Sequence, residues 1–180
     1  MRNSQPLTPS ILFCHLIFGL TVAVLTSCNT YKVNYDKNGE PVLGKNMHFS
    51  FDERPSTESL IKLDTSAYYV QIFEGRNYND EEVSNPIVLV FHNDGYYKRS
   101  SLKHYEKDSL RAKDAIWYGG KYRISGKEIE LESFAPSKGG KTKQYVRLIL
   151  KGRIDGDRII LNETKNNALI SVFQKRKNLN

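Results

Sequence analysis

The sequence predicts an all-β protein, an antiparallel up-and-down meander of about eight strands that closes into a barrel. Eleven tyrosines and eight phenylalanines favour pleated, half-buried surfaces. Short apolar or alternating runs recur between turn residues, and a helical apolar period is confined to a short turn near residues 58–63. Consecutive strands joined by tight turns pair antiparallel, and closure removes the exposed edges that an open sheet would leave.

Nine such runs follow one another along the chain. They are Met47–Phe51, Tyr68–Phe73, Ile87–His92, Tyr96–Ser100, Ile116–Ile124, Glu128–Phe134, Gln144–Ile154, Arg158–Asn162 and Ala168–Gln174. Turn residues separate several of them, namely Asn93-Asp94-Gly95, Ser125-Gly126, Asp155-Gly156 and Asn166-Asn167. Each such turn predicts a hairpin between the runs on either side of it.

The register of one hairpin follows from its side chains. A two-residue loop at Ser125-Gly126 pairs Arg123 with Glu128 and Tyr122 with Ile129. Charged pairs of opposite sign then fall on one face of the hairpin, and the apolar residues fall on the other. A slip of one residue would destroy this separation.

A second hairpin is predicted in the same way. A loop at Asp155-Gly156 pairs Gly152 with Ile159, which puts apolar residues on one face. It also opposes Arg153 to Arg158, a like-charge pair that carries a small cost.

The first 27 residues have the pattern of an export leader. Arg2 and the free amino group form a positive start, and an uncharged, mostly apolar run of about fifteen residues follows from Ile11 to Leu25. That run is shorter than the roughly 20 residues that a transmembrane helix needs. The leader therefore predicts export.

The leader ends in Leu25-Thr26-Ser27-Cys28, two small residues before a cysteine. This resembles the lipobox of bacterial lipoproteins. The resemblance implies cleavage after Ser27, a diacylglycerol on the thiol of Cys28, and stable anchoring by two or three acyl chains. An ordinary signal peptide with an incidental cysteine and an uncleaved anchor helix are the alternatives. Because Asn29 is not aspartate and no acidic cluster follows, the same resemblance implies an outer-membrane location facing the periplasm.

The chain is expected to divide into the leader (1–27), a polar tether (28–45) and a barrel domain (46–180). Its formal charge is +7, about +6 once Arg2 is removed, which suits contact with anionic lipid headgroups. Lys and Arg form no consecutive run longer than the three residues 175–177, and no nucleic-acid-binding signature occurs, so nucleic acid is not an expected partner. The domain contains no cysteine, and its stability must come from its core.

A longer resemblance lies in the second half of the chain. From Trp117 to Leu131, an aromatic-glycine-aromatic strand meets a glycine-bearing turn and an alternating strand, and Gly152–Asp157 adds a similar hairpin. This stretch is similar to the lipocalin-like domains of small Bacteroidetes lipoproteins, over residues 67–176. The resemblance implies a barrel whose mouth can hold one small apolar ligand.

Three groups of titratable residues are candidates for catalysis or metal binding. They are the histidines His48, His92 and His104, the carboxylates Glu128, Glu130 and Glu132, and the acidic run Asp80-Glu81-Glu82. The histidines lack zinc-ligand spacing, the acidic run lacks EF-hand spacing, and no motif of a catalytic nucleophile is present. The three glutamates alternate along one strand, and basic cross-strand partners predict a solvated face. The sequence predicts no enzyme, no cofactor and no metal.

Three tyrosines are the candidate ligand-lining residues. Tyr118 and Tyr122 fall on the apolar face of the first hairpin, and Tyr68 falls on a similar face by alternation. The alternative is that these rings fill the core. The leading function is a lipid-anchored envelope lipoprotein whose barrel binds a small apolar ligand. The alternative is an envelope protein-interaction or structural lipoprotein with a filled barrel. Inhibition of host lysozyme is a third class, which the positive charge disfavours because lysozyme is itself basic.

Overall fold

The structure is a computed structural model that describes residues 30–37, 39–45, 47–74, 77–108, 110–113, 115–137, 144–162 and 170–179. The leader and Cys28 lie outside the described residues, as does the turn expected at Asn166-Asn167. The expectations for those residues therefore stay predictions.

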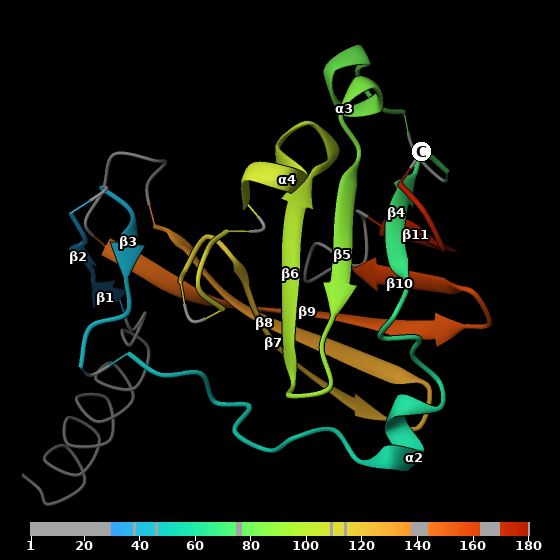
Figure 1. Ribbon diagram of the computed structural model, residues 1–180, viewed down its shortest axis with the longest axis horizontal. Helices are drawn as coiled ribbons and strands as arrows, with labels where there is room; N and C mark the ends of the chain where they lie inside the picture. The colour runs from blue at the N-terminus through green and yellow to red at the C-terminus, as the bar shows by residue number, and fades with distance from the viewer. Residues whose placement is uncertain are drawn as a thin grey trace, which may run out of the picture.

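Eight antiparallel strands follow one another in sequence order and close into a barrel (Figure 1). They are β4 (Tyr68–Ile72), β5 (Ile87–Phe91), β6 (Tyr96–Ser101), β7 (Gly119–Ser125), β8 (Glu128–Pro136), β9 (Gln144–Asp155), β10 (Arg158–Asn162) and β11 (Ile170–Arg176). Pairing of β11 with β4 completes the ring. The predicted all-β fold, an antiparallel up-and-down meander of eight strands in a closed barrel, is confirmed, and this architecture is consistent with a lipocalin-like barrel.

The remaining elements are short and lie outside the barrel strands. They are β1 (Thr30–Lys32), β2 (Asn34–Tyr35), β3 (Pro41–Val42), α2 (Thr57–Leu60), α3 (Asp80–Ser84), the 3₁₀ turn η1 (Leu102–His104) and α4 (Tyr105–Asp108). The short turn expected near residues 58–63 corresponds to α2. The run Met47–Phe51 is not assigned to a strand, contrary to expectation.

The hairpin between β7 and β8 turns one residue later than expected. Its loop is Gly126-Lys127, and Gly126 has a φ of 61°, a left-handed conformation that glycine adopts without strain. The partners consequently shift by two, so that Arg123 faces Glu130 and not Glu128. Because a shift of two preserves the alternation, the charged and apolar faces of this hairpin are those predicted.

The hairpin between β9 and β10 differs from expectation in the same way. Its loop is Gly156-Asp157, with Gly156 at a φ of 60°. Arg158 therefore faces Asp155, and the expected opposition of two arginines does not occur. In both hairpins the glycine occupies the first loop position, where the positive φ is needed.

The interior of the barrel is filled at one end. The cluster of buried residues there draws on all eight strands and on the segment after α2: Leu63, Tyr69, Leu89, Phe91, Tyr97, Tyr122, Ile129, Leu131, Ile154, Ile159, Leu161 and Phe173. Lys62 Nζ donates to the carbonyl of Gly126, and the Thr65 hydroxyl donates to Asn93 Oδ1, so this segment joins two hairpin turns at that end. We call this end the closed half. The open half lies at the other end, near α3 and α4 (Figure 1).

The polar tether expected over residues 28–45 is instead part of the fold over its described residues. β1 pairs with β9, β2 pairs with β3, and Val33 is buried. With residues 47–51, these residues form a strap across the outside of the barrel, which we call the N-terminal strap. The cluster beneath it contains Val33, Met47, Phe49, Ile116, Phe134 and Tyr145. Tyr31, Val33 and Leu43 are among the few apolar residues of the segment, and all three pack in or against this cluster.

The strap also corrects the interpretation of Glu132 as a solvated residue. Its side chain is fully buried, and its carboxylate accepts hydrogen bonds from the backbone N–H groups of Ser50, at 2.8 and 2.9 Å, and Phe51, at 3.0 Å. Arg147 Nε lies 2.9 Å from Glu132 Oε1, as an ion pair whose N–H is not aligned for a hydrogen bond. The neighbouring Glu130 remains at the surface, where it pairs with two basic residues.

We expect Glu132→Ala to lower the free energy of unfolding by about 3–5 kcal/mol, because it leaves buried N–H donors and a partly buried guanidinium without their acceptor. Glu128→Ala, on the same face but exposed, should change it by no more than about 0.5 kcal/mol. Urea unfolding of the two variants measures the difference. Equal, small effects would contradict a stabilising role for the buried carboxylate.

Candidate functional site

The barrel wall is incomplete in the open half. The pairing of β6 with β7 ends where Lys98 faces Gly119, whereas β8 continues past the partner of Lys121 to Pro136. At this end of the barrel, β7 is therefore too short to separate the last residues of β6 from the last residues of β8. The connection of residues 102–118, with η1 and α4, lies at this place (Figure 1).

A cavity of about 700 Å³ occupies this part of the barrel. Its apolar lining comes from Ile116, Trp117, Phe134, Ala135, Leu148 and Leu150, and its polar and charged lining from Tyr97, Arg99, Ser133, His104, Lys107, Asp108 and Arg111. The volume lies within the range of small-molecule sites, roughly 300–1,000 Å³. Trp117 and Leu148 remain 44% and 41% exposed, so the cavity offers uncovered apolar surface.

The cavity exists because inward side chains become smaller or more polar toward the open end. Along β8 the residues on the inner face are Ile129, Leu131, Ser133 and Ala135, in that order. Along β11 the inner face changes from Phe173 to Ser171. An eight-stranded barrel is just wide enough for large side chains to fill, so small ones leave space.

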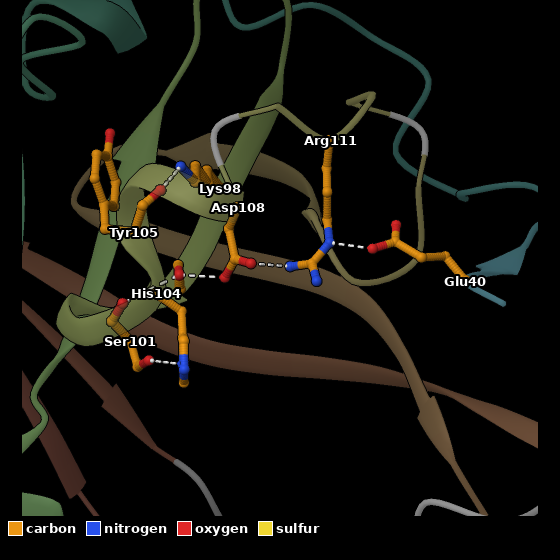
Figure 2. Close-up of polar contacts among 8 residues, drawn as sticks. Glu40, Lys98, Ser101, His104, Tyr105, Asp108 and Arg111 are labelled. Atoms are coloured by element: carbon orange, nitrogen blue, oxygen red, sulfur yellow. Dashed lines mark hydrogen bonds and ion pairs between the residues drawn. The ribbon is translucent and has the colours of Figure 1, made fainter. Parts of the chain in front are cut away.

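One wall of the cavity is held by a chain of polar contacts (Figure 2). The Ser100 hydroxyl donates to Asp108 Oδ2, and Arg111 Nη1 donates to Asp108 Oδ1. Arg111 Nε also donates to Glu40 Oε1 at 2.9 Å, which joins this wall to the N-terminal strap. The same network thus fixes α4 against the end of β6.

Lys98 provides a second attachment for α4. Its ammonium donates to the carbonyl of Tyr105 at 2.8 Å and lies 3.7 Å from the centre of the Tyr105 ring. Burial lowers the pKa of Lys98 and raises the pKa of Tyr105 to about 12. Tyr105 is therefore neutral near pH 7, and its ring face can attract the cation.

The positive charges of the cavity are only partly neutralised. Arg111 has two carboxylate partners, Asp108 and Glu40. Arg99 and Lys107 also line the cavity, and neither forms an ion pair within the described part of the chain. His104 Nδ1 contacts the Ser101 hydroxyl at 3.1 Å. The site therefore combines an apolar surface with two unpaired cations.

The three tyrosines singled out from the sequence lie elsewhere. Tyr122 is fully buried in the closed half, and its hydroxyl donates to the carbonyl of His92 at 2.8 Å. Tyr118 is also buried, with its hydroxyl 2.6 Å from His92 Nε2. Tyr68 packs edge-on against Tyr105. None of the three is among the residues that line the cavity, so a role for them in ligand binding stays a prediction.

The sequence did not predict the residues that line the cavity. Arg99 follows Tyr97 by two positions on β6, so alternation alone could have placed both on the inner face. Lys107 lies in the connection between β6 and β7, outside every predicted run, and Trp117 lies in the predicted run Ile116–Ile124 but before the start of β7 at Gly119. Leu148 lies in the strand predicted over Gln144–Ile154, but the residues before and after it in the sequence do not indicate an open space beside it.

Two of the other titratable groups singled out from the sequence have local partners. His92 contacts Tyr118, and burial lowers the pKa of its imidazole. In α3, Glu82 accepts from the backbone N–H of Asn79 as part of a capping box, and acids in the first turn favour the helix N-terminus. No group of three or more His, Cys, Asp or Glu residues that could hold a metal ion occurs within the described ranges.

Comparison of the chain with protein-family models, curated proteins and solved structures found no match. Among the described residues, no helix has the length and apolar character to cross a membrane. The class of protein is therefore defined here by the fold, a closed eight-stranded antiparallel barrel with one filled half and one open half.

We expect Tyr122→Ala to lower the free energy of unfolding by about 3–5 kcal/mol, because it leaves a hole in the closed half. Tyr122→Phe keeps the ring and loses only the hydrogen bond to His92, which should cost about 0.5–1.5 kcal/mol. Urea denaturation separates the two effects. Nearly unchanged stability in Tyr122→Ala, together with weaker binding of an apolar probe, would instead make Tyr122 part of a ligand site.

Proposed function

We propose that the protein is a lipid-anchored lipoprotein of the cell envelope. The support is the export leader followed by Leu25-Thr26-Ser27-Cys28, which resembles a lipobox. On the same resemblance we place it at the outer membrane, facing the periplasm. The net positive charge of the mature chain suits a position beside anionic headgroups.

The start of the fold lies close to the proposed anchor. Thr30 pairs with Val146 of β9, and Cys28 precedes it by two residues. Two trans peptide units span at most about 7.6 Å between Cα atoms, so a lipid on Cys28 would hold the barrel directly at the membrane. β9 begins at the open half, so the cavity would be held near the lipid surface.

For the barrel we propose the binding of one small apolar ligand in the cavity of the open half. The observation that carries this proposal is the cavity of about 700 Å³ with exposed apolar lining, Trp117 and Leu148 above all. Uncovered apolar surface in a concave site favours a ligand that removes it from water, at about 25 cal/mol per Å².

The alternative is a protein-interaction lipoprotein without a small ligand. The filled closed half favours it, as do exposed apolar residues that do not line the cavity, such as Ile61 and Leu110 at 81% and 89% exposure. Scattered surface apolar residues are common in soluble proteins, however, whereas the cavity needs an explanation of its own.

The anchor has a direct test. Cys28→Ala should leave unprocessed precursor and abolish incorporation of labelled palmitate, because the thiol is the proposed acylation point. The native chain, labelled in the same cells, is the control. Mass spectrometry that found Cys28 unmodified, or a mature start elsewhere, would contradict the lipoprotein proposal.

Leu148 and the next residue, Ile149, provide a matched test of the cavity. Leu148 lines the cavity, while Ile149 lies on the opposite face of β9 with nearly equal exposure, 41% against 43%. Leu148→Asn should weaken binding of the neutral dye Nile red about tenfold, given the value of one buried aliphatic side chain. Ile149→Asn should leave it unchanged. Fluorescence titration measures both, and equal effects would place the bound dye outside the cavity.

A further inference from the structure

The unpaired cations of the cavity point to the chemistry of its ligand. Arg99 shares the inner face of β6 with Tyr97 and belongs to the cavity lining. Arg99 and Lys107 are both exposed at the mouth of the cavity, where a bound anion can reach them beside the uncovered apolar lining. The described part of the chain supplies no carboxylate that pairs with Arg99.

The carboxylate that does line the cavity is already engaged. Asp108 accepts from Ser100 and from Arg111, on its two oxygens. Arg111 in turn has Glu40 as a second partner (Figure 2). The charged groups of this network pair with one another, and none of them pairs with Arg99 or Lys107. The charges of Arg99 and Lys107 are therefore available to a bound ligand.

Resting on the proposed function, we propose that the ligand is a single-chain amphiphile with an anionic headgroup, a carboxylate or a phosphate. Its headgroup is bound by Arg99 and Lys107, and its chain lies on the apolar lining formed by residues such as Trp117, Leu148 and Leu150. A guanidinium offers a planar pair of donors that fits either kind of anion, and an ammonium adds a point charge.

The apolar lining distinguishes this ligand from a free inorganic anion. Inorganic phosphate would satisfy the two cations but would leave Trp117 and Leu148 in water. A neutral hydrocarbon would cover those side chains and leave both cations unpaired. An amphiphile satisfies both parts of the site at once, and a cavity of about 700 Å³ accommodates one such molecule.

The test uses decanoate, decyl phosphate and neutral 1-decanol, each below its aggregation concentration. The protein is the mature chain, residues 28–180, made without the leader so that Cys28 carries no lipid; all the strands and helices described above lie within it. By titration calorimetry we expect at least one anion to bind about tenfold or more tightly than decanol, since charge-assisted hydrogen bonds add to the same apolar contact. The preference should shrink as salt is raised. The tighter anion identifies the headgroup.

Arg99→Gln and Lys107→Gln should each weaken anion binding by about ten- to a hundredfold and leave decanol binding unchanged. The control variants Arg153→Gln and Lys127→Gln remove the same charges from exposed positions in the closed half. They should leave the binding of the anions and of decanol unchanged. Circular dichroism confirms the fold of each variant. Equal binding of all three probes, unaffected by the two cavity variants, overturns the anionic headgroup but leaves the apolar-ligand proposal intact. Absence of binding for every probe overturns both.

Discussion

The buried carboxylate of Glu132 is the interaction on which the arrangement of this protein depends. Removing a carboxylate from water is costly unless other groups replace the water, and here two backbone N–H groups donate to it and the guanidinium of Arg147 forms an ion pair with it. The two N–H groups belong to Ser50 and Phe51 of the N-terminal strap. The barrel therefore cannot bury this charge without the strap, and the strap gains a fixed place on the barrel. Arg147 reinforces the arrangement because its Nη2 donates a hydrogen bond to the carbonyl of His48 in the strap.

The strap connects the proposed anchor to the cavity. At one end it begins two residues after Cys28, and within it Glu40 accepts from Arg111, whose other partner is Asp108. Asp108 lies in α4, which forms part of the cavity wall. A membrane attached at Cys28 would thus act on a segment that is hydrogen-bonded to the cavity wall. This is a different arrangement from a flexible tether, in which the position of the membrane would have no mechanical relation to the barrel.

The sequence predicted those features that repeat along the chain and missed those that depend on a single contact. Alternation identified eight barrel strands and the two faces of the β7–β8 hairpin, and an error of two in register left both faces unchanged. The burial of Glu132 was missed because its donors lie about eighty residues away, in a segment whose composition is polar. The turns were misplaced because a glycine fits either loop position, and only the backbone conformation shows which one requires it.

None of the three candidate tyrosines lines the cavity, and the filling of the barrel interior shows why for Tyr122. Aromatic residues are the ones that fill an eight-stranded barrel, so their presence indicates where space is absent. The useful signal is the change along a strand from large to small inner residues, such as Leu131 followed by Ser133 and Ala135. On β6, the cation Arg99 follows Tyr97 by two positions on the inner face. The barrel therefore has, at the same place, empty space and a cation that forms no ion pair with a described residue. The total charge of the chain cannot reveal this, because it does not show which cations lie beside uncovered apolar surface, as Arg99 does at the mouth of the cavity.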